Sequence, residues 1–294
     1  MTASAATGSS AGPRRFLLRG HAVRRGLSPL IVAAVLIVAA VIICAIAGPA
    51  IAPHDPNAQD LATGISGPSA EHWLGTDDLG RDVLSRTIVG ARTAVVGPLL
   101  VALGAMLIGN LLGLLAGYRG GTLDTLVSRY ADLVYALPAL LVAIVVVGVV
   151  GGGYFVAVAL LVVLYSPVDT RLVRSATLVQ RSQPYVEAAR VSGIPSRRII
   201  FAHVWPNVLP IAVANAFLTF AFSIVSLAAL SFLGLGVGPG TADWGRMLSD
   251  SRTLLFENEW TALAPGIALV LTAASVNVVG DWVFERLSDR GRVR

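Results

Sequence analysis

The stretch Glu187-Ala188-Ala189-Arg190-Val191-Ser192-Gly193 is the key to the fold of this chain, because it is a short charged segment between two very apolar ones. Pro184 suits the first position of a helix, where its missing N–H costs nothing, and Gly193 supplies the left-handed residue that ends one. Pro195 then opens a second short helix, and Pro206 marks the entry to the next apolar helix. The segment therefore predicts two short helices that are bent at the glycine.

The composition around this segment is that of an integral membrane protein. Hydrophobic residues make up 55% of the 294 residues and charged residues 13%, with a mean hydropathy of +0.75. Soluble domains carry roughly 25% charged residues. All 22 basic residues are arginine, so the chain lacks the lysine of a P-loop nucleotide site and of a Schiff base. The single cysteine, Cys44, lies in an apolar run and allows no disulfide within the chain.

Five uncharged runs are long enough for transmembrane helices, since a span needs about 20 apolar residues. The run from 133 to 168 is too long for one span, and Gly151-Gly152-Gly153 predicts a turn that divides it in two. The predicted fold class is all-α, a polytopic membrane protein with six transmembrane helices. These helices are expected at residues 29–53, 93–118, 126–150, 153–172, 204–233 and 261–280.

The arginines predict the orientation of the helices. If the N-terminus is cytoplasmic, most arginines fall in cytoplasmic segments, which satisfies the positive-inside rule with both termini inside. The basic start followed by an apolar run also allows a cleaved signal peptide, but the run is long and favours an uncleaved anchor. The first dozen residues are expected to be disordered. The predicted divisions are a cytoplasmic tail at 1–28, a first helix at 29–53, an external loop at 54–91, a five-helix core at 92–284 with a cytoplasmic coupling loop at 173–206, and a cytoplasmic tail at 285–294.

The charged segment itself allows two interpretations. Ala188 and Ala189 are small enough to let a partner's surface approach closely, and Glu187 offers a carboxylate to donors on that partner. Arg197 and Arg198 equally fit an amphipathic helix that lies on the bilayer surface. The Glu-Ala-Ala-x3-Gly spacing favours the docking interpretation.

That spacing resembles the EAA motif of permease subunits in ATP-binding-cassette importers, EAA-x3-G-x9-I-x-LP. The matching positions are Glu187, Ala188, Ala189, Gly193 and Pro206. The isoleucine and leucine of the motif are replaced by His203 and Trp205. The ending His203-Val204-Trp205-Pro206-Asn207 is similar to that of the peptide-importer branch.

Other segments resemble the C-type permease of dipeptide, oligopeptide and nickel importers. Residues 72–86, His-Trp-Leu-Gly-Thr-Asp-Asp-Leu-Gly-Arg-Asp-Val-Leu-Ser-Arg, resemble the signature after its first helix. Residues 230–248 resemble its outer loop before the last helix, and Asn277-x2-Gly280-Asp281-Trp282 resembles its ending. The resemblance spans residues 28–292 and implies the type I ABC importer permease fold.

The resemblance implies a permease that moves di- or oligopeptides into the cell by alternating access, with nickel or another small solute as the alternative. The implied partners are a second related permease in a heterodimer, two cytoplasmic ATPase subunits or domains, an extracytoplasmic solute-binding protein and the bilayer of the bacterial inner membrane, and no nucleic acid. The chain is expected to hold no cofactor and not to be an enzyme, since ATP and Mg²⁺ would bind the ATPase subunits. The residues expected to couple to the ATPase are Glu187, Ala188, Ala189, Gly193, Arg197 and Arg198.

Two sets of small and polar residues are further candidates. Gly109, Gly113 and Gly117 lie four apart on one helix face, which allows close packing against another helix of this chain or of the second permease. A polar stripe on the helix at 204–233 would line the solute path or would hydrogen-bond to neighbouring helices. The members of this stripe are Asn215, Thr219, Ser223 and Ser226.

Two carboxylates lie near the predicted cytoplasmic ends of helices. Asp132 is expected to pair with Arg129, three residues before it, and Asp169 with Arg171 or Arg174. With no carboxylate predicted in the middle of a span, a self-sufficient ion-coupled transporter is less favoured. A membrane-bound enzyme lacks any catalytic constellation.

The histidines give no sign of a metal site in the sequence. They are scattered along the chain, and no metal cluster is expected from their spacing. The four histidines are His21, His54, His72 and His203.

Overall fold

The computed structural model describes residues 28–151 and 153–292, and this part of the chain is helical, with no extended structure beyond an isolated bridge between Thr76 and Asp82. Nearly all of the predicted tail at 1–28, with His21, lies outside the described residues, as does Gly152 in the predicted turn. The helices are α1 (Pro29–Ile51), α2 (Val83–Arg119), α3 (Gly121–Tyr135), α4 (Ala139–Val150), α5 (Tyr154–Arg181), α6 (Pro184–Val191), α7 (Ser196–Ile199), α8 (Trp205–Phe232), α9 (Trp244–Asp250) and α10 (Trp260–Arg292).

Five helical segments of the described chain are long and apolar enough to cross a membrane: α1, α2, α5, the segment Ser196–Phe232 and α10. The pair α3 and α4 is a sixth candidate, but it is bent by 79° at a short break. The sequence predicted a single helix over 126–150, and this is wrong, because the chain forms two helices there. Pro138 precedes α4 with an extended ψ of 108°, and a proline disfavours helical geometry at the residue before it.

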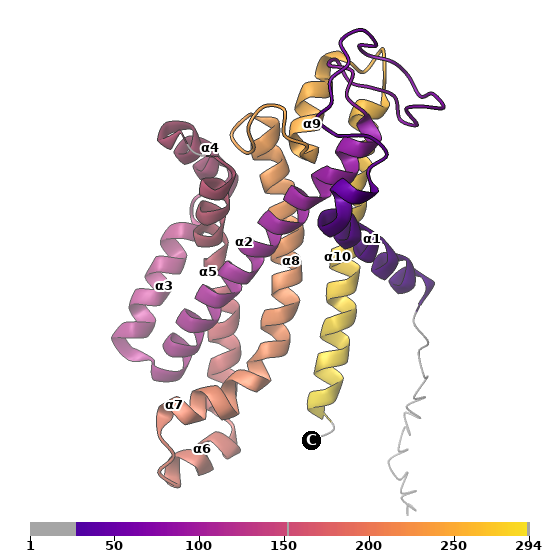
Figure 1. Cartoon of the computed structure of the whole chain (residues 1–294). Coiled ribbons are helices and arrows are strands. Elements are labelled where there is room, and N and C mark those ends of the chain that lie inside the picture. Colours follow the sequence, from indigo (N-terminus) through magenta and orange to yellow (C-terminus); the bar gives the residue numbers. More distant parts are fainter. Residues whose placement is uncertain (1–27, 152, 293–294) are drawn as a thin grey trace, which may run out of the picture.

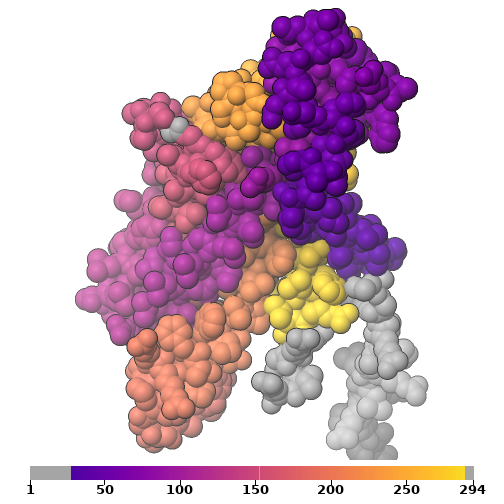
Figure 2. Space-filling model, in the orientation of Figure 1, coloured from indigo at the N-terminus to yellow at the C-terminus, as the bar shows by residue number. Residues whose placement is uncertain are grey.

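Helix α2 is the centre of the bundle. It packs against α5, α8 and α1, while α10 packs against α8 and α1. Figure 1 shows α6 and α7 at one end of the bundle, and α9 with the loop between α1 and α2 at the opposite end. In the space-filling view, α6 and α7 form a protruding lobe (Figure 2). The two polar segments that the sequence distinguishes are thus at opposite ends of the molecule.

Three helices are longer than the sequence predicted. Helix α2 begins at Val83 and not at 93, because Asp82 caps it: the Asp82 carboxylate accepts a hydrogen bond from the Ser85 N–H at 2.7 Å. Helix α5 continues to Arg181 and not to 172, because Val173 and Thr177 are buried. We call residues 52–82 the outer loop and residues 182–204 the coupling segment, after the positions and roles that the sequence predicts for them. The predicted tail from 285 continues α10 as far as Arg292.

Buried charges hold the outer loop in place. The Arg81 Nε lies 2.7 Å from Asp77 Oδ2, and the Arg86 Nε lies 3.6 Å from the same oxygen. Arg86 is only 1% exposed, and its guanidinium donates to the Pro56 carbonyl at 3.1 Å and to the Gly240 carbonyl at 3.3 Å. A buried charge needs such partners to offset its lost hydration. Arg86 therefore joins the outer loop to the segment before α9.

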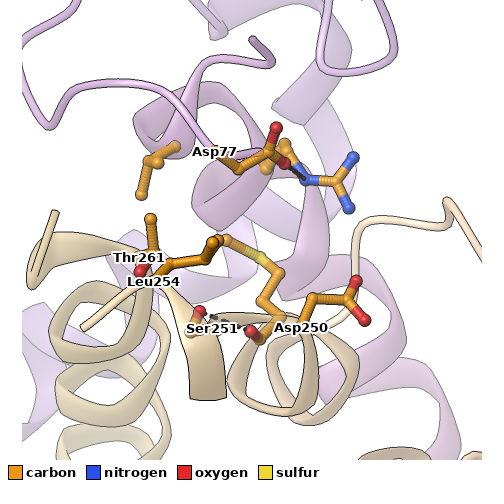
Figure 3. Close-up of a pocket in the computed structure, with 8 residues that line it drawn as sticks. Asp77, Asp250, Ser251, Leu254 and Thr261 are labelled. Carbon is orange, nitrogen blue, oxygen red and sulfur yellow. Dashed lines mark hydrogen bonds and ion pairs between the residues drawn. The ribbon is translucent and has the colours of Figure 1, made fainter. Parts of the chain in front are cut away.

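Asp77 and Arg86 also line a small pocket at this end of the bundle. Asp77 comes from the outer loop, whereas Asp250, Ser251, Leu254 and Thr261 come from the region of α9 and the start of α10 (Figure 3). The outer loop therefore packs against α9 and the start of α10, although these elements are far apart in the sequence. A hydrophobic cluster of residues from α1, α2, α8 and α9 also packs at this end of the bundle.

Candidate functional site

The coupling segment has the bent geometry that the sequence predicts. Helix α6 begins at Pro184 and is closed by a Schellman motif. The Ile194 N–H donates to the Ala189 carbonyl, and the Gly193 N–H donates to the Arg190 carbonyl, each at 3.1 Å. Gly193 has a φ of +74°, which side chains with a Cβ rarely adopt. The chain therefore turns sharply at this glycine before α7 begins.

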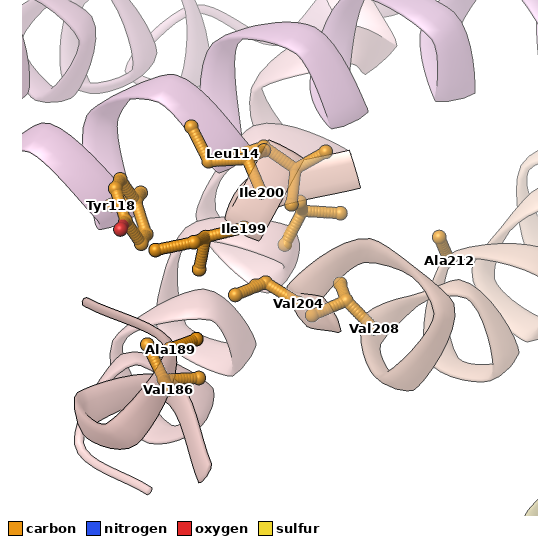
Figure 4. Packing of buried hydrophobic residues seen from close by; sticks show 10 residues of the cluster. Leu114, Tyr118, Val186, Ala189, Ile199, Ile200, Val204, Val208 and Ala212 are labelled. Atoms are coloured by element: carbon orange, nitrogen blue, oxygen red, sulfur yellow. The ribbon is translucent and has the colours of Figure 1, made fainter. Parts of the chain in front are cut away.

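A hydrophobic cluster anchors the coupling segment to the bundle. Val186 and Ala189 of α6 share this cluster with Ile199, with Val208 of α8 and with Leu114 of α2. Figure 4 shows the cluster gathered between α6, the end of α2 and the start of α8. The lobe is thus a packed extension of the chain's own core.

The outward side of the lobe carries most of the residues predicted to couple to an ATPase. The exposed members of that set are Glu187, Ala188, Gly193, Arg197 and Arg198. Ala189 differs from the prediction, because it is only 8% exposed and packs inward. Val191 is 85% exposed beside them, so the outward side is mixed polar and apolar.

Two tyrosines that the sequence did not single out connect the lobe to its neighbours. The Tyr185 hydroxyl donates to Gln180 Oε1 at 2.6 Å and accepts from Asn207 Nδ2 at 3.2 Å, which links α5, α6 and α8. The Arg190 guanidinium lies 5.7 Å from the centroid of the Tyr118 ring, within the range of a cation–π contact. Residue type alone gave no signal for either contact, since both depend on tertiary packing.

The polar stripe on α8 faces the interior of the bundle. Asn215, Thr219 and Ser223 are buried, and Asn215 Nδ2 donates to Asp169 Oδ1 of α5 at 2.8 Å. Ser226 is partly exposed and shares a 2.7 Å hydrogen bond with the Tyr165 hydroxyl of α5. The stripe therefore joins α8 to α5 in this structure.

The predicted ion pairs of Asp132 and Asp169 are wrong. Asp132 pairs with Arg171 of α5 at 2.7 Å, not with Arg129 of its own helix. Asp169 is fully buried and bonds to Asn215. Arg171 is two residues beyond Asp169 on the same helix, and residues two apart do not face each other. A buried carboxylate thus lies inside the bundle, where the sequence predicted none.

The three spaced glycines of α2 lie against α5. A Cβ at Gly109 would come within 2.2 Å of the Asp169 Cβ, and a Cβ at Gly113 would come within 2.8 Å of the Thr170 carbonyl oxygen. A Cβ at Gly117 would meet Arg174 backbone at 2.8 Å. These glycines therefore permit close helix packing within this chain rather than with a second permease.

Two histidines that the sequence treated as scattered come together in the outer loop. Potential ligand atoms of His54, His72 and Asp82 all lie within 4.8 Å of one another. Their scattered positions in the sequence did not predict this group of potential ligands. No helical or strand spacing could have predicted it, because the loop between the two histidines folds back on itself.

A family model described as binding-protein-dependent transport system inner membrane component matches residues 109–293. The chain belongs to this family. The matched residues include the three α2 glycines, the whole coupling segment and the α8 stripe. The membrane-protein character and the all-α fold are accordingly those of a transport-system membrane component.

Relatives of this inner membrane component cover most of its length. It is 36% identical over 261 residues to the dipeptide transport system permease protein DppC of Alkalihalophilus pseudofirmus, an alignment that covers 89% of this chain and 86% of that protein. It is 36% identical over 278 residues to the glutathione transport system permease protein GsiD of Pectobacterium atrosepticum, covering 94% and 89%. It is also 35% identical to the probable D,D-dipeptide transport system permease protein DdpC of Escherichia coli, covering 90% and 88%.

A solved structure shares the fold of this inner membrane component. The match is to the methionine ABC transporter MetNI in its inward-facing conformations, with a TM-score of 0.57 and 20% sequence identity. It covers 68% of this chain and 95% of the matched chain. The fold is therefore that of a type I ABC importer permease.

Proposed function

We propose that this family member is the permease subunit of an ATP-driven importer, and that the coupling segment docks onto a separate ATPase subunit. The exposed Glu187, Ala188 and Gly193 on a lobe anchored in the core carry this proposal. Arg197 and Arg198 add exposed positive charge beside them. ATP and Mg²⁺ bind the partner ATPases, since a chain without lysine lacks the P-loop lysine.

The anchoring of the lobe supports a mechanical role. Val186 and Ala189 share one hydrophobic cluster with Leu114 of α2 and Val208 of α8. Packed interiors transmit displacement because they are dense and hard to compress. A push on α6 by a closing ATPase therefore reaches α2 and α8, and alternating access follows from their movement. Ala189 serves this role from inside the lobe, whereas Glu187 serves it by direct contact.

We place the solute path beside the exposed face of α8. Leu218, Phe222 and Val225 are 44%, 66% and 50% exposed, and their spacing puts them on one face of the helix. That face meets the second, related permease of the heterodimer, and Ser226 borders the path between the two chains. The buried members of the predicted path set, Asn215, Thr219 and Ser223, hold α8 in position against α5.

The remaining partners and the orientation follow from this assignment. The coupling segment and both termini face the cytoplasm, and the outer loop faces an extracytoplasmic solute-binding protein across the bacterial inner membrane. The net acidity of the outer loops and the arginine-rich cytoplasmic segments support this orientation. The proposed cargo is a di- or oligopeptide. Nickel is the alternative, because the sequence also resembles permeases of nickel importers.

Cargo choice is tested by uptake into proteoliposomes that hold the chain with its neighbouring transporter subunits and binding protein. Saturable, ATP-dependent uptake of labelled di- or tripeptides is expected, with competition by unlabelled peptides and none by Ni²⁺. A matched preparation without binding protein is the control, because uptake in this family is binding-protein-dependent. Uptake of Ni²⁺ with no peptide uptake would reject the peptide assignment.

A further inference from the structure

Three side chains from separate parts of the outer end converge on one point. His54 follows α1, His72 lies in the middle of the outer loop, and Asp82 is the N-cap of α2. The distance from Asp82 Oδ1 is 2.9 Å to His72 Nδ1 and 3.8 Å to His54 Nδ1. The centroids of the two imidazole rings are 4.7 Å apart. This cluster is not used by the proposed coupling mechanism.

One atom of the cluster has no hydrogen-bond partner. His54 Nδ1 is buried and unpaired within the described part of the chain. Its 3.8 Å separation from the Asp82 carboxylate is too long for a hydrogen bond. A buried polar atom without a partner requires an explanation, and a bound ion is one.

The spacing of the three groups fits a tetrahedral zinc ion. Zinc bonds to histidine nitrogen and carboxylate oxygen are about 2.0–2.2 Å, so the ligand atoms of a tetrahedral site lie roughly 3.3 Å apart. The two distances from Asp82, 2.9 and 3.8 Å, lie on either side of that spacing. All three potential ligand atoms lie within 4.8 Å of one another, so binding an ion would draw the two imidazoles toward each other.

The surroundings hold the carboxylate ready for a cation. Its second oxygen accepts a 2.7 Å hydrogen bond from the Ser85 N–H, as ligating carboxylates commonly do. His54 remains partly exposed, which leaves an entry route for the ion.

We propose that His54, His72 and Asp82 bind one divalent transition-metal ion, Zn²⁺ by preference, with water in the fourth position. Two imidazoles and one carboxylate are a ligand set that suits zinc. The ion would fasten the end of α1, the outer loop and the start of α2 to one another. It is a resident structural ion and not the transported solute.

The test uses the full-length chain purified with its transporter subunits and equilibrated with micromolar free Zn²⁺. One zinc per wild-type chain is expected in excess of the amount bound by the His54→Ala complex. His54→Ala is the primary variant, because this side chain is partly exposed and its Nδ1 has no hydrogen-bond partner among the described residues. Asp82→Asn keeps a good helix cap while it removes the charged ligand, and it should also lose the zinc.

A matched control and a second readout complete the test. Asp55→Asn removes an exposed carboxylate next to the cluster and should leave the zinc content unchanged. Zn²⁺ should raise the melting temperature of the wild-type and Asp55→Asn proteins but not that of the two ligand variants. Equal zinc content in wild type and His54→Ala, or no zinc in wild type, would overturn the proposal. Neither readout involves transport, so this result stands apart from the fate of the proposed function.

Discussion

Replacing Glu187 with lysine is expected to lower the initial rate of ATP-dependent uptake at least about tenfold, while the permease itself stays folded. Glu187 is exposed and makes no ion pair within the described residues, so its replacement removes no ion pair there. Like charges brought together at an interface cost several kcal/mol, and about 1.4 kcal/mol corresponds to a factor of ten. Uptake and co-purification of the ATPase subunit are the measurements.

The control for this variant is Glu257→Lys. Glu257 is also exposed but lies near the outer end, between α9 and α10, so the same charge change should leave uptake close to wild type. Gly193 offers an independent test, since its φ is +74° and nothing lies within 4 Å of the position of a Cβ. Gly193→Val should weaken docking through backbone strain, whereas Gly193→Asn tolerates this geometry better. Wild-type docking in both Glu187→Lys and Gly193→Val would contradict the coupling role.

Replacing Gly113 with valine is expected to destabilise the permease by about 1–3 kcal/mol or more, the usual cost of overpacking. The added Cβ would lie 2.8 Å from both the Thr170 carbonyl oxygen and the Val173 Cβ. Backbone atoms cannot move aside as a flexible side chain can, so α2 and α5 would have to separate. Thermal unfolding of the detergent-purified protein, followed by size-exclusion chromatography, measures the loss.

Gly148→Val is the matched control for this variant. Gly148 lies inside α4, and nothing is within 4 Å of the position of its Cβ. Both substitutions carry the same intrinsic change from glycine to a β-branched residue in a helix, so their difference isolates the packing against α5. Equal melting temperatures for the two variants would show that close α2–α5 packing is not needed for stability.

Local chemistry made the coupling segment predictable from the sequence. Pro184 can begin a helix and Gly193 can end one whatever the rest of the chain does, and the structure has both features. Long apolar runs likewise predicted the spans, because the period and length of a run are local properties. The bend between α3 and α4 also had a local signal in the sequence, which is Pro138. The long uncharged run around this proline nevertheless favoured a single span.

Features that depend on distant partners could not be predicted. Arg86 looks like a surface charge in the sequence, but its burial depends on the carbonyl of Gly240, far along the chain. The spacing of the polar residues predicted a stripe on α8. It could not predict the hydrogen bond from Asn215 to Asp169, because that bond depends on how α8 packs against α5. His54 and His72 converge only because the outer loop is folded against α2.

This permease is expected to depend on partner ATPase subunits for its energy. The most direct measurement is peptide uptake into proteoliposomes containing the chain, its second permease and its binding protein, with and without the ATPase subunits. Uptake is predicted only when the ATPase subunits and hydrolysable ATP are both present, and an imposed ion gradient should not replace them. Gradient-driven uptake by the chain without any ATPase subunit would contradict the account.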